Sequence, residues 1–249
     1  MGIIEKITNG GLRKETLFDE SKTRYTMSAM IAGAFIGFGT LIMAVSNMIF
    51  ANVDFPIVKF VNGFVFSLAL SLVMVCGAEL FTGNILFFGT ATAKKKISLA
   101  KGAKICALSY IGNFLGALAL SALFLGADTL HSPVVESVVK LAMVKVSYTP
   151  MQMFFKGILC NVLVCLGVYA WNKLDNESAK LITVVWVILP FVAMGFEHSV
   201  ANMTCFIIAK IASPDFTFGL MLYNLVPVTI GNIIGGLLVA LPYYYIEKN

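Results

Sequence analysis

Hydrophobic residues gather into six long segments of this chain, separated by short polar connections. The segments lie near residues 27–50, 58–91, 104–126, 150–171, 181–213 and 222–246. Each is long enough to cross a hydrocarbon core of roughly 30 Å as a helix of about 20 residues. The pattern therefore predicts an all-α protein with six transmembrane helices.

The second and fifth segments are too long for one straight span, and each contains a polar, glycine-rich interruption. The interruption at residues 77–84 recurs at residues 195–202, with Gly, Glu, a small residue and Asn at the same offsets. A second shared pattern, Ile-Gly-Asn followed by a later Gly, begins at Ile111 and again at Ile230. Such backbone is tolerated at membrane depth only where it packs in protein or lines a cavity, so we expect two broken helices on a solute path.

The paired interruptions indicate an internal duplication, with repeats at about 27–126 and 150–246. Three spans per repeat is an odd number, so the second repeat must be inverted relative to the first. We expect a single channel domain over residues 27–246, preceded by a cytoplasmic segment, 1–26, and followed by a cytoplasmic C-terminus, 247–249. Most basic residues then lie on one side, which the positive-inside rule assigns to the cytoplasm. The expected location is the cytoplasmic membrane of a prokaryote.

Composition supports the membrane class, because 59% of the 249 residues are hydrophobic and only 12% are charged, against roughly 25% charged in soluble domains. The net charge of +5 reflects topology, so we expect the lipid bilayer and not nucleic acid as the partner. The five cysteines lie in apolar runs without metal-ligand spacing. We therefore expect no disulfide framework, no metal and no cofactor.

Two stretches carry a family resemblance. Residues 75–83, Val-Cys-Gly-Ala-Glu-Leu-Phe-Thr-Gly, and residues 157–167, Gly-Ile-Leu-Cys-Asn-Val-Leu-Val-Cys-Leu-Gly, resemble the two signatures of the formate/nitrite transporter family, which includes hydrosulfide channels. The second departs at Gly167, where the family pattern has Ala. The resemblance covers about residues 27–246. It implies a homopentamer of aquaporin-like protomers, each with its own pore for small monovalent anions, and no enzymatic activity.

His198 is the only histidine within a predicted span, and an ionisable residue inside a membrane is a functional hypothesis by default. A packing role is its alternative. The resemblance makes it the central pore histidine and makes Thr82 its partner across the pore. Burial favours the neutral ring, which can donate a hydrogen bond to an anion or transiently protonate it.

Further candidates surround this pair. Asn161 and Asn202 can offer amide donors, with interhelical hydrogen bonding as the alternative, and by resemblance Lys145 attracts anions, with a surface position as its alternative. The resemblance also places apolar constrictions, for which plain helix packing is the alternative: Phe66, Leu70 and Phe191 on the outer side, Leu80 and Phe81 on the inner side. Finally, we interpret Glu79 and Glu197 as structural groups that satisfy backbone amides freed by the helix breaks.

The sequence thus predicts a path for formate, nitrite or hydrosulfide. It leaves open which anion is carried and whether transport is channel-like or coupled to protons. A pore for a neutral small solute explains the repeat equally well, but has no need of a histidine and a lysine together. A membrane enzyme would need a nucleophile or metal constellation, which one intramembrane histidine does not provide.

Overall fold

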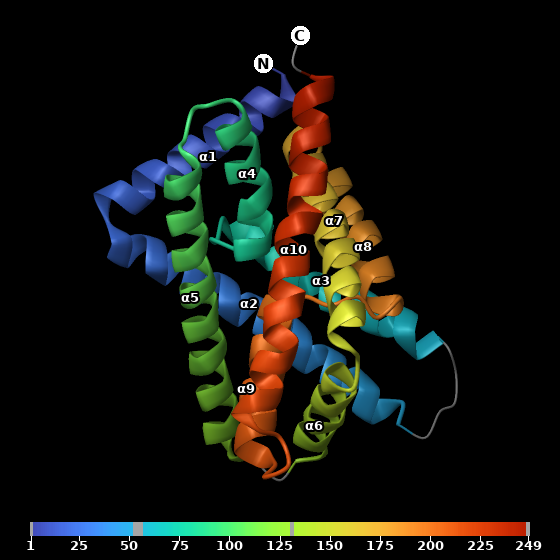
Figure 1. Ribbon diagram of the computed structural model, residues 1–249. Coiled ribbons are helices and arrows are strands. Elements are labelled where there is room, and N and C mark those ends of the chain that lie inside the picture. Colours follow the sequence, from blue (N-terminus) through green and yellow to red (C-terminus); the bar gives the residue numbers. More distant parts are fainter. Residues whose placement is uncertain (1, 52–56, 130–131, 248–249) are drawn as a thin grey trace.

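The computed structural model describes residues 2–51, 57–129 and 132–247, and Figure 1 shows that these form a bundle of helices. The helices are α1 (Ile3–Glu20), α2 (Lys22–Ile49), α3 (Ile57–Cys76), α4 (Phe81–Ala93), α5 (Leu99–Phe124), α6 (Pro133–Val146), α7 (Pro150–Lys173), α8 (Glu177–Ala193), α9 (Ser199–Ala212) and α10 (Phe218–Ile246). A short π-helical turn, Leu125–Thr129, extends α5. The expected all-α fold is confirmed.

The two long segments are broken where the sequence indicated. Helices α3 and α4 form the second segment and separate at residues 77–80, and helices α8 and α9 form the fifth and separate at residues 194–198. Helices α2, α3, α5, α7 and α10 are long and apolar enough to cross a membrane. The first of them begins at Lys22, earlier than the expected residue 27. Of the expected C-terminal segment, residues 248–249 lie outside the described residues.

Two further helices are not among the expected spans. Helix α1 crosses the end of the molecule where both termini lie (Figure 1), and it packs on α4 with Ile4, Ile7 and Gly11 buried. Helix α6 lies at the opposite end, with Val138 and Ala142 buried against α2 and α9. Helix α1 thus lies at one end of the bundle and helix α6 at the other.

The repeated Ile-Gly-Asn pattern marks two tight helix seams. A Cβ on Gly116 of α5 would lie 1.8 Å from the carbonyl oxygen of Met30 in α2, and a Cβ on Gly235 of α10 would lie 2.2 Å from that of Ile158 in α7. Only glycine permits so close an approach, and small residues at such seams are typical of membrane helix packing. The seams bring the asparagines of the same pattern, Asn113 and Asn232, next to the first residues after the two helix breaks.

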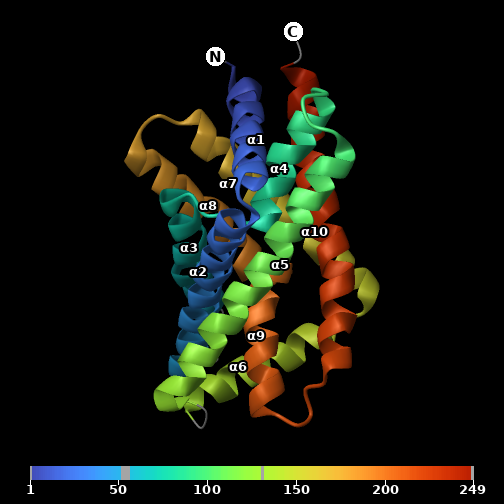
Figure 2. The same ribbon diagram turned by 90° about the vertical axis from the view of Figure 1, so that its left-hand side faces the viewer.

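Both views show α4 and α9 starting near the middle of the molecule and running to opposite ends (Figures 1 and 2). Their N-termini, at Phe81 and Ser199, therefore face the interior. The positive end of each helix dipole lies at that terminus. The centre of the bundle is thus favourable for negative charge without holding a net positive charge there.

Candidate functional site

The two breaks have the same backbone geometry. Gly77 and Gly195 each have φ of +68°, a conformation that glycine adopts without a Cβ penalty. One residue further on, the amide of Ala78 donates to the carbonyl of Val73 at 3.0 Å, and that of Phe196 donates to Phe191 at 3.0 Å. Each helix therefore closes with a wide turn before the chain starts its next helix.

Asn113 and Asn232 support the restarted helices. The Oδ1 of Asn113 accepts from the amide of Phe81 at 3.0 Å, and its Nδ2 donates to the carbonyls of Ala29 and Glu79. The Oδ1 of Asn232 accepts from the amide of Ser199 at 2.9 Å, and its Nδ2 donates to the carbonyls of Gly157 and Glu197. Buried backbone groups at each break are satisfied by an asparagine from the neighbouring seam.

Each glutamate of the motif forms a buried ion pair. Glu79 accepts from Lys14 Nζ at 2.8 Å and Glu197 accepts from Lys145 Nζ at 3.0 Å. The second carboxylate oxygen of each accepts from an amide five residues later, at 3.0 Å from Asn84 and 2.7 Å from Asn202.

This arrangement differs from the expectation that the carboxylates would satisfy backbone amides freed by the breaks. Asn113 and Asn232 take that role, while Glu79 and Glu197 balance lysines. A carboxylate balanced in this way repels a passing anion far less than an unpaired one.

His198 contacts Thr82 at the centre, with 2.9 Å between Nε2 and Oγ1. His198 is also the N-cap of α9, and its Nδ1 accepts from the amide of Ala201 at 3.1 Å. A nitrogen that accepts carries no proton, so this network assigns the proton to Nε2, which donates to the Thr82 hydroxyl. Both residues are buried. The structure therefore brings together the two residues that the family resemblance paired.

Two cavities approach this pair from opposite ends. The α6-side cavity has a volume of 130 Å³ and is lined by His198, Lys145, Phe66 and Phe191 among others. The α1-side cavity has a volume of 190 Å³. Its lining includes Leu80 and Gly83, which lie two residues before and one residue after Thr82, together with Lys14, Leu70 and Val168. Within the described chain the two linings share no residue. Packed side chains thus separate the cavities at the level of His198 and Thr82.

The apolar residues divide differently from the expected rings. Phe66 and Phe191 line the α6-side cavity, with ring centroids 5.6 Å apart in an edge-to-face arrangement. Leu70 was expected beside them, but it lines the α1-side cavity with Leu80. It lies one helical turn closer than Phe66 to the break in α3, a rise of about 6 Å, which moves it to the other side of the centre.

Phe81 does not line either of these two cavities. Its ring packs against Tyr110 with centroids 4.9 Å apart, and it lines a lateral groove between α4, α5 and α10. Leu80 is the N-cap of α4 and has extended backbone, whereas Phe81 is the first helical residue, so the two side chains point in different directions. Only Leu80 faces the α1-side cavity.

The two candidate asparagines have their amide hydrogens engaged by the protein. Nδ2 of Asn161 donates to the carbonyls of Thr82 and Asn232, at 3.2 and 2.6 Å. Nδ2 of Asn202 donates to Glu197 and to Asn224, at 2.7 and 2.8 Å. Both are fully buried. This geometry fits interhelical support, the alternative considered for each, and not the donation to an anion that we expected.

Lys145 lies in the last turn of α6 and not on the surface, since only 13% of its side chain is exposed. Its counterpart at the other end is Lys14 of α1, which the charge pattern had only suggested as a topology residue. Lys14 lines the α1-side cavity beside Glu79. The amphipathic first twenty residues were the available signal for α1, but no spacing in the sequence connects Lys14 with Glu79.

The matches to known proteins cover nearly the whole chain. A family model described as formate/nitrite transporter matches residues 1–245. The nitrite transporter NirC of Escherichia coli (strain K12) is 34% identical over 248 residues, which is 97% of this chain and 90% of that protein. Among solved structures, an FNT family ion channel has a TM-score of 0.90 at 30% identity and covers 98% of both chains. A pentameric formate channel with formate bound has a TM-score of 0.85 at 28% identity, covering 92% of this chain and 99% of that one.

Proposed function

The chain belongs to the formate/nitrite transporter family, and we propose that each protomer passes a small monovalent anion of a weak acid, namely formate, nitrite or hydrosulfide, across the membrane. Its relatives are transporters and channels, so it is a transport protein and not an enzyme. The observation that carries the proposal is the buried contact of His198 with Thr82, approached by a cavity from each end. Likeness to a pentameric formate channel supports a homopentamer.

The ends of the path attract an anion without trapping it. Lys14 and Lys145 each line a cavity, and each is balanced by a glutamate, so neither ion pair adds net charge to its cavity. The exposed Lys59 gives the α6-side cavity one further positive charge. The Nζ group of a lysine has three donors, and a carboxylate needs only one or two of them. A passing anion can therefore be hydrogen-bonded while its release stays easy, as conduction requires. The N-termini of α4 and α9 add attraction from the centre.

Apolar side chains remove water from the anion before it reaches the centre. Phe66 and Phe191 narrow the α6-side cavity, and Leu70 and Leu80 narrow the α1-side cavity. A hydrated metal ion or a large solute loses too much hydration energy at such a constriction. A weakly hydrated monovalent anion, or its neutral conjugate acid, loses far less.

At the centre, we propose that the anion accepts a hydrogen bond from His198 Nε2 in place of the Thr82 hydroxyl. The Nδ1 contact supports this role, because an imidazolium ring would turn a second N–H toward the amide of Ala201, which is itself a donor. A neutral ring that gave up its Nε2 proton would become an imidazolate, which is strongly unfavourable. This geometry therefore favours hydrogen bonding of the anion by a neutral histidine over transient protonation of the anion.

The proposed orientation places both termini in the cytoplasm of a prokaryote, in its cytoplasmic membrane. The connection between α4 and α5, which carries Lys95 and Lys96, and the start of α5, which carries Lys104, lie at the same end of the molecule as both termini (Figure 1). Basic residues concentrate on the cytoplasmic side of membrane proteins. The α6-side cavity then opens to the outside.

Uptake by liposomes containing the purified protein tests the proposed function. Formate, nitrite and hydrosulfide should enter at several pH values, whereas the neutral solutes urea and glycerol should not. Liposomes without protein give the background rate for each solute. Entry of glycerol at a rate equal to that of the anions would overturn the proposal in favour of a neutral-solute pore.

A further inference from the structure

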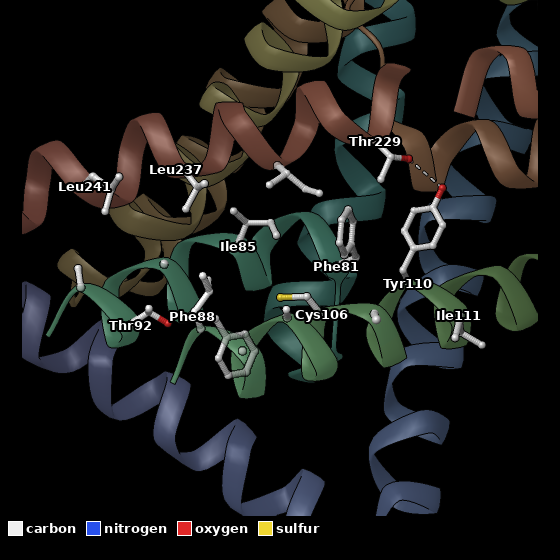
Figure 3. Close-up of a pocket in the computed structure, with 17 residues that line it drawn as sticks. Phe81, Ile85, Phe88, Thr92, Cys106, Tyr110, Ile111, Thr229, Leu237 and Leu241 are labelled. Carbon is white, nitrogen blue, oxygen red and sulfur yellow. Dashed lines mark hydrogen bonds between the residues drawn. The ribbon is translucent and has the colours of Figure 1, made fainter. Parts of the chain in front are cut away.

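A long apolar groove lies on the side of the bundle, away from the central path. Figure 3 shows it between α4, α5 and α10, and its volume is 640 Å³. Phe81, Phe88 and Cys106 contribute to its floor, and Leu237 comes from α10. A hydrogen bond of 2.9 Å between the hydroxyls of Tyr110 and Thr229 lies near one end. The remaining lining is almost wholly apolar.

The length of the groove suits an acyl chain. Along α5 its lining runs from Leu99 to Ile111, a helical rise of about 18 Å, close to the roughly 15 Å of hydrocarbon in one leaflet. Ala103 and Ala107 are exposed on this face, so the groove is open at its side. A bilayer cannot leave such a space empty, because apolar surface beside an empty space loses its dispersion contacts.

Basic residues stand at one end of the groove. Its lining includes Ala93, the last residue of α4, and Ala103, so Lys95, Lys96 and Lys104 lie next to its mouth. All three are exposed. In the part of the chain that the structure describes, none of the three has a carboxylate within ion-pair distance, whereas the neighbouring Lys94 and Lys101 pair with carboxylates of α1.

Lys95 adopts a backbone conformation that is unfavourable for a residue with a Cβ. Helix α4 ends in a turn closed by the amide of Lys96, which donates to the carbonyl of Ala91 at 2.9 Å. Lys95 takes the left-handed position of that turn, with φ of 58°, where glycine is the common residue and avoids the Cβ penalty. The turn fixes the backbone of Lys95 and Lys96 two and three residues after Ala93, which lines the groove.

We propose that this groove binds an anionic phospholipid, with one acyl chain along α5 and α10 and the headgroup phosphate on Lys95, Lys96 and Lys104. Cationic side chains at the surface and an apolar channel directly below them match the order of groups in such a lipid. Juxtamembrane lysines are known to attract anionic lipid headgroups. A neighbouring protomer is the competing occupant of the apolar channel. The three lysines favour the lipid, because within the described chain none of them has a carboxylate within ion-pair distance.

Native mass spectrometry of the intact assembly tests the site, after incubation with equal amounts of phosphatidylglycerol and phosphatidylcholine. The wild-type protein should retain phosphatidylglycerol in preference. A triple variant, Lys95→Gln with Lys96→Gln and Lys104→Gln, should lose about fivefold in relative affinity for each lysine, equivalent to about 1 kcal/mol. A matched triple variant removes basic residues of α1 and α7 instead, and it should bind as the wild type does: Lys6→Gln, Arg13→Gln and Lys173→Gln.

A second variant fills the groove. Ala107→Trp, or the milder Ala103→Leu if the tryptophan prevents folding, should reduce retention of both lipids while the assembly stays intact. Equal retention of the two lipids by the wild type, or an unchanged preference in the lysine variant, would overturn the proposal. So would dissociation of a folded assembly by the filling variant, because that result would make a neighbouring protomer the occupant. None of these readings depends on which solute the protein transports.

Discussion

The ion pair of Lys145 with Glu197 makes the most quantitative prediction. Their side chains are 13% and 3% exposed and the charged atoms lie 3.0 Å apart. At an effective dielectric of about 20, two unit charges at this distance attract with about 5 kcal/mol. Much of this compensates for the loss of hydration, so removal of one partner, which leaves the other charged and buried, should cost about 3 to 5 kcal/mol.

Lys145→Met should therefore lower the unfolding temperature by roughly 10 °C, at about 2 to 4 °C per kcal/mol for a chain of this size. It should also slow anion uptake, because the Glu197 carboxylate then stands uncompensated beside His198. The double variant, Lys145→Met with Glu197→Gln, removes both charges and should recover most of the stability and part of the uptake. The control is Lys140→Gln, which changes an exposed lysine of the same helix and should stay within about 0.5 kcal/mol of wild type.

Thermal unfolding of the solubilised protein and formate uptake by liposomes supply the two readouts. Glu197→Gln alone completes the comparison. The reasoning is refuted if the losses of stability in Lys145→Met and Glu197→Gln simply add in the double variant. Salt gives a second distinction. A lysine acting only as a distant attractor would lose its effect at high ionic strength, whereas a buried pair is screened much less. We expect the uptake defect of Lys145→Met to persist in high salt.

Three other predictions follow from the cavities and the breaks. Leu80→Ala should raise anion flux by widening the α1-side constriction, whereas Phe81→Ala, which changes the lateral groove instead, should not; equal increases in liposome uptake would contradict the assigned side-chain directions. Asn113→Ala and Asn232→Ala each remove three hydrogen bonds and should cost about 3 kcal/mol in thermal unfolding; wild-type unfolding temperatures would show that other groups hold the breaks. Gly77→Ala adds a Cβ to open space at positive φ, so an unfolding loss of about 1 to 2 kcal/mol would measure backbone strain alone, and no loss would mean that the break relaxes.

The breaks and His198 could be anticipated because their signals are local, whereas the pairing of His198 with Thr82 was implied by the family resemblance. A polar, glycine-containing stretch inside an apolar membrane segment indicates a broken helix. The recurrence of the stretch, at Gly77 and again at Gly195, strengthened that prediction. His198 stood out because it is titratable. The pairing of Asn113 and Asn232 with the two breaks was present in the repeat as a pattern, but its geometric purpose appears only when α5 and α10 are seen against α2 and α7.

The remaining features depend on distance in space. Lys14 reaches Glu79 because α1 folds back across α4, and hydrophobic patterning of the membrane spans carries no information on that contact. Leu70 and Phe81 were misplaced because the side of the centre that a residue faces depends on about one helical turn, or on one residue at a helix start. Asn161 and Asn202 could not be assigned for a similar reason. An asparagine that donates to an anion and one that donates to a neighbouring helix look the same in the sequence.

Liposome uptake of formate by His198 variants, followed together with an internal pH dye, tests the central claim most directly. His198→Asn keeps a cap acceptor for α9 and a hydrogen-bond donor for the anion, but it cannot exchange a proton near neutral pH. Our account expects this variant to conduct and His198→Phe, which has neither group, to lose passage, with thermal unfolding confirming that both are folded. Loss of passage in folded His198→Asn to the same extent as in His198→Phe would contradict the account, because it would make proton donation, and not a hydrogen bond from a neutral ring, the function of this histidine.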